Sequence, residues 1–356
     1  MKFIISGDVF LGKKTNIGKE VKKLLAFNDY WIFNFENVFE DINAESRDDK
    51  SSILSFSLSD FNSFFNQIQT GNIITTLSNN HIHDLGDSGI LNTIRVLNNN
   101  NINYLGIHKE NEKPDSIILG DNIKIGLISG STDDFEVMAI TNSKMKYNVN
   151  DIRKEDFLKK IVDLKKNVDY LIVIPHWGRE YMDLPSLQNR KLAHKWIDLG
   201  ADIVIGHHPH VIQGKEIYKG KNIYYSLGNF IFPDFYNKNG ILKKWKKSNC
   251  YSISLEVEFT KDQFKIYEHG LYFNTSKNIV NYCDTSISIL NSKSEYLSKN
   301  ITFKKFFMKW EKNYLKVLKK TYSPYKRIIS FLTTKHKNHS RIKYMFIRIK
   351  KRLKEI

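Results

Sequence analysis

The sequence predicts a layered α/β fold with two sheets. Short apolar runs rich in β-branched residues recur along the chain, as at residues 72–77 and 169–174, and amphipathic stretches with helical spacing separate them. Polar side chains gather directly after several of these runs. The segments 222–227 and 251–259 alternate as antiparallel strands do, which adds a second sheet. With 356 residues the chain is long enough for one large domain or two smaller ones.

The first two predicted strands each end at a carboxylate. Residues 2–6 form a short apolar run that leads into Gly7 and Asp8. Residues 31–37 alternate apolar and polar side chains, which brings Glu36 to the strand end. Carboxylates at strand ends suit hard metal ions, and Glu36 could bridge two of them. Two alternatives stay open: Gly-Asp is a common turn, and Glu36 could simply face solvent.

A polar loop, SNNHIHDLGDSG, follows the run at residues 72–77 and precedes a predicted helix around residues 90–97. Asn80 could ligate a metal through its amide oxygen, and His81 could donate a hydrogen bond to a substrate oxyanion. Asp84 could orient His81 through the second ring nitrogen. The alternative is ordinary turn chemistry, in which Asn, His, Asp and Gly are common.

Histidines follow the next two buried runs. Residues 169–174 lead into His176, with Arg179 and Glu180 shortly after it, near the rim of the expected site. Imidazoles at the carboxyl ends of strands can offer a lone pair to a cation if the other ring nitrogen is held.

Three more histidines follow residues 202–205, namely His207, His208 and His210. Pro209 disfavours helical geometry at His208, so we expect His208 and His210 on extended backbone, from which both could reach one metal cluster. A polar surface turn is the alternative.

Taken together, six side chains follow predicted strands and offer only oxygen and nitrogen ligands: Asp8, Glu36, Asn80, His176, His208 and His210. Such a set fits one or two divalent cations held a few Å apart, with open positions for water and substrate. Mixed histidine and carboxylate ligands favour zinc, manganese or iron over magnesium and calcium.

Six strings in this order resemble a known family. They are GDVFLG, NFEN, NNHxxDxGxxG, HWGREY, GADIVIGHHPHVIQ and YSLGNFIF. The chain resembles the capsule-synthesis CapA and poly-γ-glutamate biosynthesis proteins over roughly residues 1–270. The resemblance implies the four-layer α/β/β/α sandwich of calcineurin-like metallophosphoesterases.

The resemblance also implies roles for individual residues. Glu36 stands where the superfamily has a bridging acid, and His81, with Asp84, resembles the histidine that protonates the leaving group or holds the phosphate. The other ligands would divide between a first metal, with Asp8 and His210, and a second metal, with Asn80, His176 and His208. Four further residues are expected against the substrate: Arg179, Glu180 and His207, at the rim of the site, and Asn229.

One departure from the superfamily pattern concerns the first metal. Calcineurin-like enzymes usually begin with Asp-x-His, whereas Asp8 is followed by Val9 and Phe10. CapA-like proteins share this gap. The first site therefore lacks one imidazole, which leaves open whether one metal or two are bound.

Two functions are compatible with these features. The first is a metal-dependent hydrolase that acts on a phosphoester or on a linkage of an anionic polymer, with His81 supplying the leaving-group proton. The second is an accessory protein of capsule or poly-γ-glutamate synthesis, which binds an anionic polymer without cleaving it.

The net charge of +17 is concentrated at the C-terminal end. From residue 301 onward the sequence has 18 Lys and Arg against two acids, while the rest is almost neutral. A neutral body argues against a nucleic-acid-binding core, and no nucleic-acid partner is expected.

We predict a metallophosphoesterase-like domain at residues 1–273 and a mainly helical, Lys-rich extension at 274–356. The extension could lie on an anionic membrane surface, or be a solvated helix or a disordered end.

No segment has the roughly 18 consecutive apolar residues of a membrane-spanning helix, and Asp8 interrupts any signal-peptide core. Cys250 and Cys283 have no metal-binding or redox spacing. We therefore expect a cytoplasmic protein, or one held peripherally on the inner face of the membrane.

Overall fold

The structure is a computed structural model of the chain. It describes residues 1–40, 50, 52–69, 71–109, 116–132, 146–298, 309–310 and 312–314. Two compact units are present, Met1–Asn300 and Ile301–Ile356. In the second unit the described residues are helical, and the rings of Trp310 and Tyr314 stack with centroids 5.1 Å apart.

The larger sheet of the first unit has nine strands, and β1 and β3 lie near its middle. Its order is β2 (Asn16–Ile17), β21 (Ile279–Tyr282), β20 (Phe264–Asn274), β19 (Tyr251–Phe259), β1 (Lys2–Val9), β3 (Tyr30–Phe35), β6 (Asn72–Thr76) and β7 (Asn103–Leu105), with β16 (Asn229–Ile231) paired to the end of β1. The neighbours β1, β3, β6 and β7 run parallel, so their carboxyl ends meet at one edge.

The second sheet has six strands and a parallel centre. Its order is β14 (Lys215–Tyr218), β15 (Lys221–Tyr224), β13 (Ile203–Ile205), β12 (Tyr170–His176), β10 (Ile125–Ser131) and β9 (Ser116–Leu119). The prediction for residues 222–227 is correct for the antiparallel pairing of β15 with β14 and wrong for its pairing with β13, which is parallel. Sequence alternation reports which face is buried, and not the direction of the neighbouring strand.

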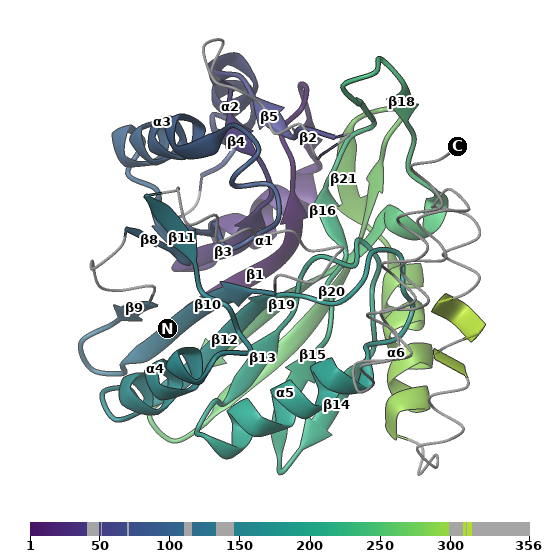
Figure 1. Cartoon of the computed structure of the whole chain (residues 1–356). Coiled ribbons are helices and arrows are strands. Elements are labelled where there is room, and N and C mark those ends of the chain that lie inside the picture. Colours follow the sequence, from purple (N-terminus) through teal and green to yellow (C-terminus); the bar gives the residue numbers. More distant parts are fainter. Residues whose placement is uncertain are drawn as a thin grey trace, which may run out of the picture. The chain divides into compact units, whose positions relative to one another are not determined.

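Helices cover the outer faces of both sheets (Figure 1). The bounds of these helices are α1 (Lys19–Ala26), α2 (Leu58–Phe65), α3 (Gly86–Asn99), α4 (Glu155–Lys165) and α5 (Leu187–Asp198). The helix α6 (Asp284–Ser298) instead contacts strands of both sheets, and its Leu290 belongs to the core between them. The helices α1, α2 and α3 lie on the nine-stranded sheet, where Phe61 and Phe64 pack among apolar side chains of β1 and β3. The helices α4 and α5 cover the six-stranded sheet.

One large core lies between the nine-stranded sheet and its helices, and a second lies between the two sheets. Ile5 and Ile32 from the nine-stranded sheet pack with Leu127, Ile172 and Ile203 from the six-stranded sheet. Each sheet packs against helices on one face and against the other sheet on the other face. Because the central strands are buried on both faces, their sequences are continuous apolar runs. The predicted four-layer α/β/β/α sandwich is confirmed.

The remaining described elements are short. They are the pairs β4 (Val38–Phe39) with β5 (Ser55–Phe56), β8 (Ile107–Lys109) with β11 (Tyr147–Val149), β17 (Phe235–Tyr236) with β18 (Leu242–Lys243), and the 3-10 helix η1 (Lys247–Asn249). The elements β21 and α6 follow the predicted domain boundary at residue 273, and both belong to the first compact unit. The basic extension beyond it lies almost entirely outside the described residues.

Among the described residues, no helix combines the length and apolar character that a membrane crossing requires.

Candidate metal centre

Strand pairing brings the predicted site residues to one end of the two sheets. In the nine-stranded sheet Asp8 of β1 lies beside Asn34 of β3 on one side and Asn229 of β16 on the other. In the six-stranded sheet His176, the last residue of β12, forms an isolated bridge with His207 just after β13. Because the sheets face each other, the two rows meet. All six predicted ligands are buried: Asp8, Glu36, Asn80, His176, His208 and His210.

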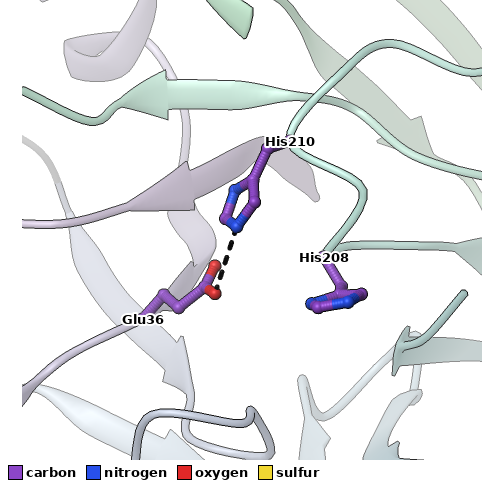
Figure 2. A group of neighbouring side chains, drawn as sticks. All are labelled: Glu36, His208 and His210. Atoms are coloured by element: carbon purple, nitrogen blue, oxygen red, sulfur yellow. Dashed lines mark ion pairs between the residues drawn. The ribbon is translucent and has the colours of Figure 1, made fainter. Parts of the chain in front are cut away.

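Glu36 occupies the middle of the cluster. Two sets of potential metal ligands each have their ligand atoms within 4.8 Å of one another, namely Glu36 with His208 and His210, and Asp8 with Glu36 and His176. Figure 2 shows the carboxylate of Glu36 and the ring of His210 pointing toward each other, with His208 beside them. The Nε2 of His210 is 3.5 Å from Oε1 of Glu36.

His176 links the loop after β6 to the loop after β13. Its Nε2 lies 2.9 Å from Oδ1 of Asn80 and 3.1 Å from Nδ1 of His208. The same nitrogen is 3.8 Å from Oε1 of Glu36. Three elements distant in sequence thus direct one amide oxygen and two imidazole nitrogens at a common point.

Asp8 contacts the histidine loop from the other side. Its Oδ1 lies 3.1 Å from Nδ1 of His207, and its Oδ2 accepts the backbone N–H of His208 at 3.3 Å. The Oδ2 is also 3.7 Å from Nδ1 of His210. Phe10, two residues after Asp8, packs on Phe232, with ring centroids 5.1 Å apart. The rim position expected for His207 is wrong, because its side chain is fully buried beside Asp8.

The backbone of the histidine loop is not extended. His208 has φ 96° and His210 has φ 54°, so the expectation of extended backbone at these residues is wrong. Positive φ is costly for residues with a side chain and persists only where the surrounding structure enforces it. Here the turn lets both imidazoles point inward, and Nδ1 of His210 meets Oδ1 of Asn229 at 2.8 Å, which fixes its ring orientation.

Two asparagines that the sequence did not single out as site residues hold the carboxylates in place. Asn34 donates from Nδ2 to Oδ1 of Asp8 at 2.8 Å and to Oε2 of Glu36 at 3.3 Å. Asn79 donates in turn to Oδ1 of Asn34 at 3.2 Å, and its own Oδ1 accepts the backbone N–H of His81 at 3.0 Å. Both lie in strings already noted, NFEN and NNHxxD, so their proximity to the site was detectable, although their partners were not.

His81 is held by the buried carboxylate of Asp84, which also forms an ion pair with Lys50. Its Nδ1 lies 2.6 Å from Oδ2 of Asp84, and Nζ of Lys50 donates to Oδ1 of the same carboxylate at 2.6 Å. Lys50 also donates to the backbone carbonyl of Asn80. Burial lowers the pKa of His81 to about 4, while Asp84 opposes this shift and Lys50 adds to it. Nothing in the sequence marked Lys50, which lies in a polar connecting segment.

The electrostatics of the cluster favour a cation. Burial, with the neighbouring imidazoles, holds the pKa values of His176 and His208 well below the usual range, so both rings are neutral and keep a lone pair. Burial and the adjacent Asp8 raise the pKa of Glu36 well above its usual range. Burial also raises the pKa of Asp8, but contacts with His207 and His210 outweigh burial and lower it overall.

Two buried ligand atoms in the cluster, Oε1 of Glu36 and Nε2 of His208, have no hydrogen-bond partner. A buried polar atom without a partner is costly, and a bound cation would satisfy both. The donor chemistry, burial and charge of the cluster are therefore compatible with a divalent metal ion.

Two predicted substrate contacts, Arg179 and Glu180, follow β12 a few residues after His176. Arg179 and Glu180 are half-buried, and the charge of Glu180 contributes to the raised pKa of Glu36. The ring of Trp245 lies 5.2 Å from that of His210, which the sequence did not anticipate.

Comparison with known proteins identifies the family. The sequence model of the family described as "Bacterial capsule synthesis protein PGA_cap" matches residues 5–234. The chain belongs to this family. The match covers every cluster residue from Asp8 to Asn229, and it confirms the resemblance that the motifs indicated.

Curated relatives cover part of this chain. The chain is 32% identical to the capsule biosynthesis protein CapA of Bacillus anthracis over 245 residues, which are 64% of this chain and 58% of that protein. It is 35% identical to the PGA biosynthesis protein CapA of Bacillus subtilis over 158 residues, 44% of this chain and 41% of that protein. A probable polyglutamine synthesis accessory protein of Mycobacterium tuberculosis is 25% identical over 169 residues, 44% of each chain. The chain thus spans about half the length of these relatives.

Among solved structures, the calcineurin-like phosphoesterase YfkN from Bacillus subtilis aligns with a TM-score of 0.42 and 15% identity. The alignment covers 82% of this chain and 96% of that chain.

Proposed function

We propose that the chain is a metal-dependent hydrolase of the phosphoesterase type that acts in the synthesis of an anionic surface polymer. The observation that carries the proposal is the position of Glu36, which belongs to both sets of potential ligands. A single carboxylate shared by two sets is the arrangement that two adjacent divalent ions require.

The ligands divide between two positions in this proposal. Glu36 would lie between the two ions. As the family resemblance implies, Asp8 and His210 would hold the first ion, and Asn80, His176 and His208 the second. The two geometric sets group the histidines differently, with His208 beside His210 and His176 beside Asp8, so all these ligands lie close to both positions. The short distances from Nε2 of His176 to Asn80 and to His208 support the second group, because ligands of one ion approach each other in this way.

A divalent ion bound here would supply Lewis acidity and lower the pKa of a water molecule toward neutrality. The chain itself supplies orientation and proton transfer. Asp84 fixes the Nδ1 side of His81, which leaves Nε2 free of that contact. His81 is neutral at pH 7 because its pKa is about 4, and an anionic substrate beside it would raise that pKa and enable proton donation to the leaving group.

The polymer is inferred from the relatives. Proteins with CapA names in two Bacillus species take part, by those names, in capsule and PGA biosynthesis. We therefore propose an anionic polymer, or a phosphoester intermediate of its synthesis, as the substrate. Arg179 and Glu180 at the edge of the cluster, with His207 and Asn229 inside it, are the proposed substrate contacts.

A second candidate function is an accessory protein that binds the polymer without hydrolysis. Phe10 supports it, since an aromatic ring occupies the position of a first-metal imidazole. The name of the mycobacterial relative, an accessory protein, points the same way.

Metal content tests the proposal directly. Purified protein, loaded with Mn²⁺, Zn²⁺ or Fe²⁺ and then desalted, is expected to retain one or two ions per chain. His208→Ala should retain fewer, whereas His269→Ala, a half-buried histidine paired with Glu256 outside the cluster, should retain as many as the wild type. Negligible metal in all three proteins would contradict the proposal.

Turnover separates the two candidates. Hydrolysis of a chromogenic phosphoester by the metal-loaded protein, lost in Asp8→Asn and in His176→Ala, is the result expected of a hydrolase. Binding of poly-γ-glutamate without any turnover, by a protein that retains its metal, would favour the accessory role.

A further inference from the structure

The β17–β18 hairpin exposes an apolar patch. Tyr236 is 68% exposed, Ile241 57% and Leu242 37%. The strand register pairs Tyr236 with Leu242, so these two side chains stand together on one face of the hairpin, and the exposed Ile241 directly precedes Leu242 in the chain. The paired strands extend away from the two main sheets (Figure 1). Such a patch on a protruding element is a candidate contact surface.

The hairpin holds this patch in a defined conformation. Asn237 accepts the backbone N–H groups of Asn239 at 3.1 Å and Ile241 at 2.8 Å through one side-chain oxygen, which closes the turn. At the base, Phe235 packs inward on Phe10 at 5.7 Å. The outward position of the apolar side chains therefore follows from the fold of the hairpin.

Four lysines follow the patch: Lys243, Lys244, Lys246 and Lys247, all exposed. Within the part of the chain that the structure describes, none of the four forms a salt bridge. Several exposed lysines elsewhere in the same unit do, including Lys23 with Glu20, Lys166 with Asp163 and Lys219 with Asp198. The hairpin thus carries four exposed lysines beside a single carboxylate, Asp234, which accepts the backbone N–H of Trp245 at 2.9 Å.

An anionic lipid bilayer is the partner that matches both properties. Tyr, Ile and Leu side chains can enter the headgroup region, and lysines beside them can contact lipid phosphates. A soluble polyanion would account for the lysines and leave the apolar patch unexplained. We propose that the β17–β18 hairpin docks the protein on an anionic bilayer surface, with Tyr236, Ile241 and Leu242 inserted.

Docking would also orient the metal centre. Trp245, which follows β18, packs on Phe232 at 4.9 Å and on His210 at 5.2 Å. The base of the hairpin is therefore in contact with the cluster, and the bilayer would lie at this end of the sheets. The docking proposal does not depend on hydrolysis, and it holds for a metal-binding or a metal-free protein.

Vesicle sedimentation with the full chain tests the proposal. The protein is mixed, in about 0.15 M salt, with phosphatidylcholine vesicles with or without about one quarter phosphatidylglycerol. The basic C-terminal end is the same in every protein compared, so a difference between variants reports the hairpin. Replacing the three apolar residues (Tyr236→Ser, Ile241→Ser, Leu242→Ser) should reduce partitioning onto anionic vesicles about tenfold. A matched control, Phe27→Ser with Ile217→Ser, removes apolar side chains that are 77% and 66% exposed elsewhere, and it should bind as the wild type does.

A fluorescence measurement provides an independent readout. Leu242→Trp should gain a vesicle-dependent blue shift and quenching by brominated lipid, relative to the wild type, whereas Phe27→Trp should gain neither. Unchanged partitioning of the triple variant, or no added quenching in Leu242→Trp, would overturn the proposal. Vesicle binding that is lost in Lys243→Ser with Lys244→Ser, but is unchanged in the triple apolar variant, would also overturn the proposal. That result would indicate a surface for a soluble polyanion such as poly-γ-glutamate, polyphosphate or single-stranded DNA.

Discussion

At the scale of single residues, the cluster depends on side chains that are not themselves proposed ligands. Asn34 is the main example, because its amide nitrogen donates to Asp8 and Glu36 together. Two buried carboxylates so close repel each other, and a neutral donor between them reduces that repulsion without adding charge. Asparagine at this position therefore keeps both acids available to a cation.

Replacing Asn34 by Asp should destabilise the metal-free protein by about 3 kcal/mol, because the donor is lost and a third buried carboxylate is added. Urea denaturation in the presence of a chelator measures this difference in the free energy of unfolding. The control is Asn16→Asp on the exposed edge strand β2, which should change the free energy by less than about 0.5 kcal/mol. Equal stability of the two variants would contradict the role given to Asn34.

At the scale of elements, buried contacts between neighbouring segments fix the ends of the strands. Glu216 of β14 joins that strand to α5, since Arg190 donates to it at 2.7 Å and Nε2 of His194 lies 3.1 Å away. The hydroxyl of Tyr225 donates to the same carboxylate at 2.6 Å. Burial raises the pKa of Glu216, but these hydrogen bonds outweigh it and lower the pKa to about 2.

The folded-state pKa of Glu216 predicts a pH dependence. Because it is lower than the ordinary value of 4.5, the ionised carboxylate stabilises the fold above pH 4.5, and this stabilisation is lost as the pH falls toward 2. Glu216→Gln should therefore lose about 3 kcal/mol at pH 7, and its difference from the wild type should shrink below about pH 4.5. Urea titrations at several pH values measure this, with Asn16→Gln, which exchanges one exposed uncharged side chain for another, as a control whose difference should stay constant. A pH-independent difference for Glu216→Gln would contradict the assignment.

The junction of β1 and β16 leaves no room for a side chain at Gly7. A Cβ there would lie 1.9 Å from the carbonyl oxygen of Gly228, which is backbone and cannot move aside. Gly7→Ala should destabilise the fold by about 3 kcal/mol or more and reduce metal retention, because Asp8 is the next residue. Gly220→Ala is the comparison, since Gly220 has φ 76° but open space, and only the backbone strain of about 1 kcal/mol should appear. Thermal unfolding and metal content of both variants test this, and a mild effect at Gly7 would contradict the close approach.

At the scale of the whole molecule, the cluster joins the two sheets. Asp8 and Glu36 come from the nine-stranded sheet, and His176 and His208 come from the six-stranded sheet. The unfolded chain does not bring these groups together, so a cation that binds them binds the folded state. Binding and folding are therefore coupled across the central core.

A bound divalent ion should stabilise the wild type by about 2.7 kcal/mol at a free concentration one hundred times its dissociation constant. The urea midpoint, measured with excess Mn²⁺ or Zn²⁺ and then with a chelator, gives the shift. His208→Ala should lose most of it, and His269→Ala should retain it. A shift that is equal in all three proteins would place the bound ion outside the cluster.

The sequence alone determined the strands and the polar residues at their ends. Buried apolar runs are local features of the sequence, so they predict the strands β1, β3, β6, β12 and β13. The polar residues directly after these runs are the predicted ligands: Asp8, Glu36, Asn80, His176 and the histidines after residue 205. Ordered motifs also indicated the family, which the match over residues 5–234 confirms.

Tertiary structure decided how these ends meet. Lys50 reaches Asp84 across 34 positions and His207 reaches Asp8 across 199, and neither contact has a local signature. The inward turn of His208 and His210 opposes the local preference for extended backbone, because contacts with Asp8 and Asn229 hold it. Periodicity encodes burial within a segment, whereas the pairing of sheets and the course of loops depend on partners far away in the sequence.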